Sequence, residues 1–405
     1  MKARLILTIL AIGCMVAACH KEPEEEKPEV FVANQLSING GEPITYETGS
    51  LADALTVKTI TKLEWTDISQ MNATDVMALR TLKSTLRNID AGKVRFIDDG
   101  TTYKGYSSDA EKVKPEELPQ YFLSGFTQLE TAVLPAKVTK LGSCSMSNCK
   151  KLTECILPPK LLSMGRYVFH YCTSLSSITL PETFVSINDD TCFGSCTSLE
   201  SFTFPDATTN PGVQTFNGCT NLKSIHFGEN CNPDWMRQDI VMSCFNIEEV
   251  TVSSKNKKVK QDGGALATAD GRRLLIQPTL CPDGKYVVKG YPENIMFFYN
   301  APYVSIEFAE GCEIIDYCAF SSCKKLTTII FPSTLKSIAR THPATNGNTS
   351  LSTIIVRSAT PPAVANDFLS KIGPFKEILV PASSVNAYKA ADVWKAYASK
   401  IKAGV

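Results

Sequence analysis

The sequence is poor in the residues on which metal and nucleic-acid chemistry depend. Its 405 residues include 4 His and 3 Trp, and Lys plus Arg equals Asp plus Glu at 41 each. A protein with balanced charge lacks the broad positive field that drives sequence-independent binding to nucleic acid. With so few His, and with no pair of Cys spaced C-x-x-C, the pattern of a structural zinc site is missing. We expect neither nucleic acid nor a metal ion as a ligand.

Catalytic motifs are missing as well. The sequence contains no nucleophile elbow, phosphate-binding loop, paired metal-binding His or Gly-rich dinucleotide turn. The adjacent acids Asp98–Asp99 and Asp189–Asp190 point to opposite sides if their segments are extended, and glycoside hydrolysis needs two carboxyl groups about 5–9 Å apart across a cleft. We therefore predict no enzyme activity, no catalytic residue and no cofactor.

The apolar run at the N-terminus is too short to span a membrane. It extends over 14 residues, Leu5 to Ala18, against roughly 20 for a transmembrane helix. Lys2 and Arg4 precede it, which is the layout of a secretory signal peptide, here residues 1–18.

The residues after this run suggest a lipid anchor. The stretch VAAC, Val16 to Cys19, resembles a bacterial lipobox, which implies cleavage before Cys19 and acylation of Cys19; an ordinary signal peptide with an incidental Cys is the alternative. Residues 19–34 are rich in Glu and are expected to form a disordered tether. This tether resembles the surface-export signal of Bacteroides-type lipoproteins, which implies an outer-membrane anchor facing outward. A lipoprotein facing the periplasm stays open.

A motif of about ten residues recurs through the middle of the sequence. The copy CTSLSSITLP from Cys172 is followed by CTSLESFTFP from Cys196, and the successive spacings from Phe126 to Cys244 are 23, 23, 24, 23 and 25 residues. A period in this range is typical of a solenoid. The alternation of Ile178 and Leu180 suits a strand with one buried face, and Pro181 ends it. The return segment, as in ETFVSINDDTCFGS, favours a tight turn or a short helix. A single coil buries too little apolar surface to repay the ordering of its backbone, so neighbouring coils have to stack.

These copies resemble the BspA-type leucine-rich repeat of bacterial surface proteins, which has the same Leu-x-x-Ile-x-Leu-Pro strand, a similar return and a Cys at the coil junction. The resemblance covers about Pro119 to Pro381 and implies an α/β repeat solenoid with one short parallel strand per 23-residue coil. It also implies an N-terminal cap in residues 35–118, a β-hairpin inserted at about 255–290 and a helical C-terminal cap in residues 382–405. In the N-terminal cap, Asn72 or Thr74 is a candidate helix N-cap.

Six Cys share one register of the repeat. Stacking places them in a vertical row, and side chains one rung apart point the same way at about 4.8 Å, which is too far for a disulfide. We therefore predict buried free thiols at Cys149, Cys172, Cys196, Cys219, Cys244 and Cys323. A disulfide among the off-register Cys231, Cys281 and Cys312 stays open for the case in which the compartment is oxidising.

Candidate ligand-binding residues come from two patterns. The outward position of each strand forms a row that is polar in its middle, and two copies carry aromatic residues where the others have small ones just before the junction. The candidates are Thr179, Thr203, His226, Thr251 and Glu307 in the row, and His170, Tyr171, Phe298 and Tyr299 before the junctions. The pair Phe298–Tyr299 has an alternative interpretation as packing against the inserted hairpin.

Taken together, the sequence predicts a monomeric, non-catalytic surface lipoprotein that binds a protein, such as a host or extracellular-matrix protein, and mediates adhesion. The alternative is a surface glycan-binding protein for polysaccharide capture. That alternative predicts exposed Trp or Tyr in a line, and Trp65 and Trp394 lie in the two caps.

Overall fold

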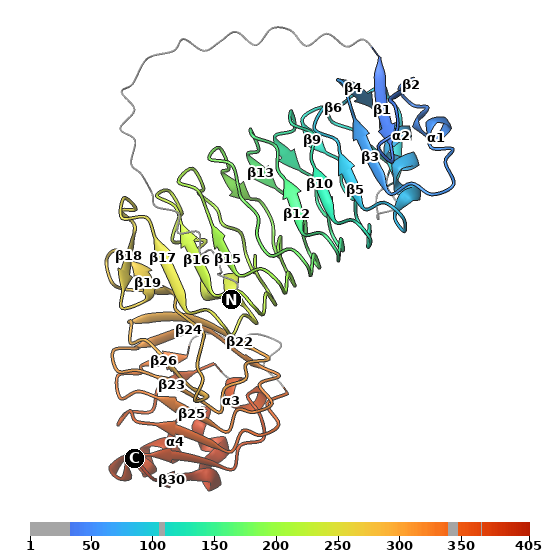
Figure 1. The fold of residues 1–405 in the computed structure, drawn as a ribbon. Helices are drawn as coiled ribbons and strands as arrows, with labels where there is room; N and C mark the ends of the chain where they lie inside the picture. Colours follow the sequence, from blue (N-terminus) through green and yellow to red (C-terminus); the bar gives the residue numbers. More distant parts are fainter. Residues whose placement is uncertain (1–32, 105–109, 339–346, 366) are drawn as a thin grey trace, which may run out of the picture.

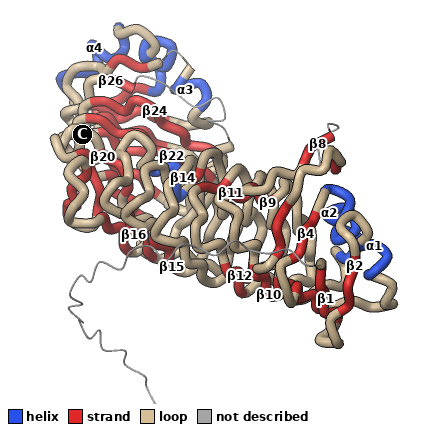
Figure 2. The backbone as a smooth tube through the Cα atoms, turned by 90° about the horizontal axis from the view of Figure 1, so that it is seen from above, coloured by secondary structure: helices blue, strands red, loops and turns tan. Residues whose placement is uncertain are grey.

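The protein folds into an elongated, bent stack of coils (Figure 1). The computed structural model describes residues 33–104, 110–338, 347–365 and 367–405. The predicted signal peptide, Cys19 and most of the predicted tether lie outside these residues. Within the described ranges, no helix has both the length and the apolar composition that a bilayer crossing requires. The α-helices gather at the two ends of the stack, α1 and α2 at one end and α3 and α4 at the other (Figure 2).

Parallel strands of successive coils form the first ladder of the solenoid, as the repeat predicts. In the N-terminal half, the ladder comprises β3 (Lys62–Trp65), β5 (Asn88–Asp90), β10 (Thr131–Val133) and β12 (Glu154–Ile156), and then β15 (Ser201–Thr203), β16 (Ser224–Phe227) and β17 (Glu249–Val252). In the C-terminal half, it comprises β21 (Lys285–Val288), β23 (Ser305–Phe308), β25 (Thr328–Phe331), β27 (Thr353–Val356), β29 (Glu377–Val380) and β30 (Ile401–Ala403). The ladder therefore extends into both segments predicted as caps.

A second parallel ladder runs along the return segments. Many coils therefore contribute two strands, and the expectation of one strand per coil describes only the first ladder. The members of the second ladder are β9 (Glu117–Leu118), β11 (Lys140–Leu141), β13 (Ser163–Met164) and β14 (Ser186–Ile187), and later β22 (Glu293–Tyr299), β24 (Ile314–Ser321), β26 (Ser337–Ile338) and β28 (Ala363–Val364). The earlier return segments pair over only two residues per coil, which is too short for strand alternation to be visible in the sequence.

One expected strand is missing. Residues 176–181 form no strand, although their letters match the motif, because no backbone hydrogen bond joins Ser177, Ile178, Thr179 or Leu180 to either neighbouring coil among the described residues. The first ladder of the N-terminal half is therefore split into two sheets, one ending at β12 and the other beginning at β15.

The N-terminal end is closed by a small mixed unit. The antiparallel strands β1 (Asn34–Ile38) and β2 (Ile44–Tyr46) continue the first sheet beyond β3. Asn72 is the N-cap of α2 (Ala73–Leu79), and its side chain accepts from the N–H of Asp75, so the first of the two expected N-caps is confirmed. The other elements here are α1 (Leu51–Ala54), β4 (Ser69–Met71), η1 (Arg80–Leu82), β6 (Val94–Phe96), β7 (Thr102–Lys104) and β8 (Ala110–Lys112).

The insertion separates two hydrophobic cores. The strands β18 (Val259–Asp262), β19 (Ala265–Thr268) and β20 (Leu274–Ile276) form an antiparallel sheet, which contains the predicted hairpin and adds a third strand. Alternate residues of β19 face opposite ways: Leu266 packs in the core of the N-terminal half, whereas Ala265 and Ala267 pack in that of the C-terminal half. The insertion thus fills the junction between the halves.

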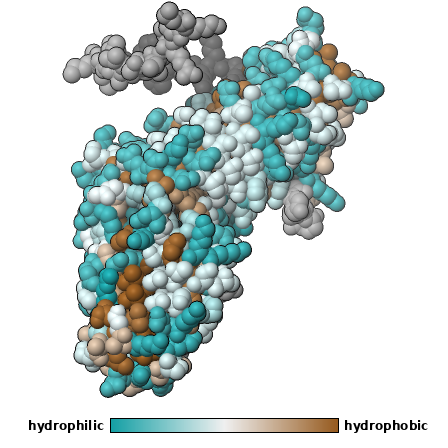
Figure 3. Space-filling view, turned by 60° about the horizontal axis from the view of Figure 1, so that its bottom comes forward, coloured by the Kyte–Doolittle hydropathy of each residue, from teal (hydrophilic) through white to brown (hydrophobic). Residues whose placement is uncertain are grey.

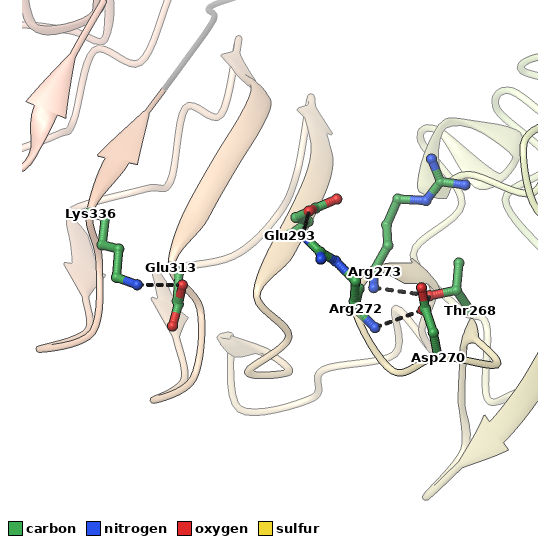
Figure 4. A network of polar contacts seen from close by, with 7 residues as sticks. All are labelled: Thr268, Asp270, Arg272, Arg273, Glu293, Glu313 and Lys336. Carbon is green, nitrogen blue, oxygen red and sulfur yellow. Dashed lines mark hydrogen bonds and ion pairs between the residues drawn. The ribbon is translucent and has the colours of Figure 1, made fainter.

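Polar contacts attach the insertion to the coil that follows it. Asp270 accepts from Thr268 at 2.6 Å and from the N–H of Arg272 at 3.0 Å, which fixes the β19–β20 turn. The Arg272 guanidinium then reaches Glu293 of β22 at 2.8 Å (Figure 4). Farther along the stack, Lys336 and Glu313 pair at 2.7 Å, 23 residues apart, so a similar ion pair links adjacent coils.

The C-terminal end is closed by short helices and a last strand. These are α3 (Phe368–Lys371), η3 (Ala382–Ser384), α4 (Val385–Ala390) and η4 (Trp394–Lys400), followed by β30, while η2 (Gln238–Val241) lies in the middle of the stack. Tyr388 and Trp394 are buried and pack edge to face at 5.1 Å. The expected helical cap is present, and β30 extends it into the sheet.

Each of the six register Cys is fully buried and bonds the coil before it. The thiol donates to a backbone carbonyl oxygen 25–28 residues earlier at 2.9–3.3 Å. In four of the six cases the accepting residue is a Phe of the preceding return segment, and these rings stack on neighbouring Phe, as Phe169 does on Phe193 at 5.3 Å. Asn348 occupies the same register, and its amide N–H groups donate to Phe320 and Ile372, both at 2.7 Å.

Five of the thiols in this column, other than that of Cys172, are neutral donors. Burial raises the pKa of Cys149, Cys196, Cys219 and Cys244, and raises that of Cys323 to about 11. All 12 Cys whose side chains are described are free, including Cys231, Cys281 and Cys312, for which a disulfide had stayed open.

Replacing Cys219 with Ala is expected to lower the free energy of unfolding by about 1–2 kcal/mol, because it removes the bond between coils to the Phe193 carbonyl, which keeps only the N–H of Cys196, and opens a small cavity. Urea denaturation measures this change. The matched control is Cys281→Ala, at a partly exposed thiol outside the column, for which we expect a change of less than about 0.5 kcal/mol. Equal losses in both variants would contradict a special role for the column.

Candidate functional site

The polar candidates of the first ladder form a short row on three adjacent strands. Thr203 of β15 pairs with His226 of β16, which pairs with Thr251 of β17. The His226 Nδ1 and Thr251 Oγ1 atoms lie 2.8 Å apart, so the two side chains orient each other. The structure brings these three candidates together as one surface.

Thr179 lies beside this row, at the split in the ladder. A hollow of about 360 Å³ separates its segment from β12, and one of about 290 Å³ separates it from β15 and Thr203. The inward-facing Cys155 and Ile178 are only half-buried here, whereas the equivalent Phe202 of β15 is 3% exposed. The split therefore opens the surface toward the core.

Glu307 lies apart from the polar row. It sits on β23 between Val287 of β21 and Ile330 of β25, in the sheet on the far side of the insertion. Its carboxylate is 2.6 Å from the Arg357 guanidinium, so an internal ion pair already satisfies it. The expected single face from Thr179 to Glu307 is thus divided by β18–β20.

Apolar side chains occupy the outward positions around Glu307. Ile330, Ile355 and Leu379 follow one another in the register of β25, β27 and β29, and all three are partly exposed. Val287, on the other side of Glu307, is 51% exposed. Figure 3 shows hydrophobic residues gathered in a strip on the lower half of the molecule, where these strands lie. We refer to Val287, Ile330, Ile355 and Leu379 as the apolar strip.

The aromatic candidates fall on the turn side and differ in exposure. Tyr171 and Tyr299 are exposed, at 49% and 41%. Phe298 is buried at 4% and stacks on Phe320 at 5.2 Å, so its assignment as an exposed ligand residue is wrong. It also meets Tyr286 edge to face, just after the insertion, so packing is its role.

Tyr171 adopts a backbone conformation that is costly for its type. The residue before each register position has positive φ, and in other coils it is Gly, Asn or Ser, as at Gly125, Asn148, Ser195 and Gly218. Tyr171 has a φ of 61°, and its ring lies 4.2 Å from that of His170. Gly194 leaves room for His170, because a Cβ there would meet the imidazole at 2.7 Å. Burial lowers the pKa of His170.

The acidic pairs show no catalytic arrangement. Asp98 accepts from the N–H of Gly100, whereas Asp99 accepts from the hydroxyl and the N–H of Thr101, and these two bonds of Thr101 lower the pKa of Asp99. Asp190 and Asp189 face Arg166 at 2.7 and 3.7 Å. No group of three or more His, Cys, Asp or Glu that could hold a metal ion occurs in the part of the protein that the structure describes.

Sequence reasoning missed two exposed apolar residues. Val287 lies in a strand that carries no copy of the motif. Trp235 is 43% exposed in the loop before η2, where the repeat gives no expectation for an individual side chain. The turn residues Asn232, Pro233 and Asp234 just before Trp235 were the available signal for a surface position.

Comparison with protein families assigns most of the solenoid. Residues 114–207, 145–263 and 294–384 match the family model described as "BspA type Leucine rich repeat region", in 6 copies. A search of curated proteins found no match.

Solved structures of several bacterial repeat proteins are similar to this chain. A T. pallidum leucine rich repeat protein is 25% identical over 34% of this chain and 65% of its own, with a TM-score of 0.30, so the chain spans just under two thirds of that relative. A leucine rich cell surface protein from Faecalibacterium prausnitzii is 17% identical over 70% and 81% of the two chains, with a TM-score of 0.42. A leucine-rich repeat protein from Bacteroides ovatus is 18% identical over 93% and 100%, with a TM-score of 0.34.

Replacing Tyr171 with Gly is expected to stabilise the fold by up to about 1 kcal/mol, because Gly adopts positive φ without strain. The shift of the urea midpoint measures the effect, and Asn148→Gly, in the preceding coil, is the control with little strain to relieve. A loss of stability on replacing Tyr171 would mean that its ring contacts outweigh the backbone cost.

Proposed function

Because the chain belongs to the BspA type leucine rich repeat family, we propose that it is a non-catalytic cell-surface lipoprotein that binds a protein partner through the outward face of its strands. The single observation that carries this proposal is the apolar strip. Its four side chains face outward on strands of one sheet, so their exposure is a property of the surface and not of a loose end. Contiguous exposed apolar patches with polar borders mark interaction sites in soluble proteins.

The surroundings of the strip suit a protein partner. The ion pair between Glu307 and Arg357 lies between Val287 and the other three residues of the strip, and Lys402 and Glu377 lie within 3.4 Å of each other at its far end. Ile330, Ile355 and Leu379 thus lie between two ion pairs, and an apolar centre with a charged rim is the usual anatomy of a protein interface. A rigid ladder also loses little conformational entropy on binding, since its side chains are already ordered by the coils.

The polar row adds a second contact surface to the proposal. Thr203, His226 and Thr251 offer hydroxyl and imidazole groups on adjacent rungs, and Thr179 extends the row across the hollow. Hydrogen-bonding groups of this kind give orientation and specificity more than affinity. A partner that spans both halves would use the row for recognition and the strip for binding energy.

The proposed location follows from the N-terminal sequence. A short apolar run after two basic residues, then Cys19 and an acidic tether, supports export and lipid anchoring at the outer membrane. The tether would hold the body clear of the lipid surface, where a host or matrix protein can reach the strands.

We expect Ile355→Lys to weaken binding to the partner at least tenfold, roughly 1.4 kcal/mol, because it places an ammonium in the middle of the strip. The test is surface plasmon resonance against a panel of fibronectin, laminin, collagen and fibrinogen. The matched control is Ile156→Lys, since Ile156 is an outward Ile of β12 in the other half and is 52% exposed. No binding to the panel, or an equal loss in both variants, would overturn the proposal.

A further inference from the structure

A surface hollow between two return segments lies away from both the strip and the polar row. It has a volume of about 300 Å³ and is bordered by residues 187–190 of one coil, residues 210–213 of the next and Trp235 of the third. Two isolated parallel bridges, Ser186↔Asn210 and Asp190↔Val213, hold the coils together at either end of it. No further bridge joins the two backbones between these points, and the hollow lies there.

Trp235 differs from the other two Trp of the protein. Trp65 and Trp394 are at most 2% exposed, and their indole N–H groups donate to Tyr46 at 2.8 Å and to Pro362 at 2.9 Å. Trp235 is 43% exposed, and no hydrogen bond of its indole N–H is found among the described residues. A large apolar ring with a free donor is therefore presented at the hollow.

The position of Trp235 is fixed by its neighbours. Its backbone N–H donates to Asn232 at 3.0 Å, and the N–H of Asn232 donates to Thr209 of the preceding coil at 3.0 Å. The Arg273 guanidinium, from the insertion, donates to the Pro233 carbonyl at 3.2 Å and to Asp234 at 3.3 Å. The loop is thus held from both sides, so the ring needs little ordering on binding.

The opposite walls carry planar polar groups with free capacity. The side-chain oxygen of Asn188 accepts from Ser186 at 2.6 Å, and that of Asn210 accepts from the N–H of Gly212 at 2.9 Å. These bonds orient both amides, and no described hydrogen bond uses their NH₂ groups. Asp189, half exposed, lies 3.7 Å from Arg166 and retains free acceptor positions. The buried Ile187 forms an apolar part of the lining.

We propose that this hollow binds one neutral pyranose residue of a glycan, with the apolar face of the sugar on the Trp235 ring and its hydroxyls bonded to Asn188, Asn210 and Asp189. A pyranose has an apolar face and an equator of hydroxyls, and the hollow offers a matching aromatic face, amide donors and carboxylate acceptors. The volume lies at the lower end of the range for ligand pockets, roughly 300–1,000 Å³, which suits one ring.

Charge favours a neutral sugar over an acidic one. Asp189 and Asp190 contribute two negative charges, and Arg166 compensates one of them. A carboxylated or sulfated sugar would meet net repulsion in this hollow. The site would work independently of the apolar strip, so it adds a glycan specificity to a protein-binding protein.

Acrylamide quenching of Trp fluorescence tests the site on the full-length protein, because Trp235 is the accessible indole while Trp65 and Trp394 are buried. The probes are glucose, mannose, galactose and N-acetylglucosamine, followed by an array of neutral and acidic glycans. We expect at least one neutral probe to protect Trp235 with a Kd of about 1 mM. Trp235→Ala should abolish array binding, and Asn188→Ala should weaken it at least tenfold.

Leu280→Ala removes an apolar side chain that is equally exposed, at 43%, from another loop and serves as the control that should leave binding unchanged. Binding in the presence of EDTA should also be unchanged, because the proposed contacts with the sugar involve no metal ion. The proposal is overturned if no neutral glycan binds, if only acidic glycans bind, if Trp235→Ala binds as well as the native protein, or if EDTA removes binding. Loss of protein binding in Ile355→Lys leaves this result unaffected, so the two proposals fail separately.

Discussion

The structure depends on hydrogen bonds that link coils of the repeat to the coils before them, from a buried thiol to a backbone carbonyl. The bond recurs at six coils with distances of 2.9–3.3 Å, and Asn348 makes the equivalent contact with an amide. The accepting carbonyl can also bond an N–H of its own turn, as Phe193 does with Cys196 at 3.2 Å, so the thiol adds the bond that joins this turn to the next coil. The apolar core and both ladders are built on stacking that this contact holds in register.

The functional surfaces occupy positions that the stacking does not determine. Inward residues such as Ile225 and Ile354 are buried, and their replacement is constrained by packing. Outward strand residues are constrained only by strand geometry, so the polar row and the apolar strip differ along one scaffold, and Trp235 lies in a loop that the repeat does not determine. The insertion keeps the row and the strip apart, because β18–β20 interrupt the outward face while Leu266 and Ala267 join the cores beneath it.

The sequence predicted the features that recur through the copies of the repeat, and it missed features that differ from one coil to the next. The Cys register and the strand motif follow from spacing and periodicity, the inserted hairpin is implied by the family resemblance, and the structure has all three. The second ladder was missed because β11, β13 and β14 have only two residues each. The split at Thr179 could not be foreseen, because CTSLSSITLP and CTSLESFTFP are almost the same in letters. Phe298 was misassigned because exposure depends on the neighbouring coil, here on Phe320 and Tyr286.

Hydrogen–deuterium exchange on the native protein and on Cys219→Ala tests the coil-to-coil bond most directly. If the thiol joins neighbours, exchange should quicken in the coils that contain Phe193 and Cys244 as well as in that of Cys219, while amides beyond Ile306, in the second core, keep their protection. Faster exchange confined to the few residues around position 219 would contradict the account, because the bond would then stabilise only its own turn.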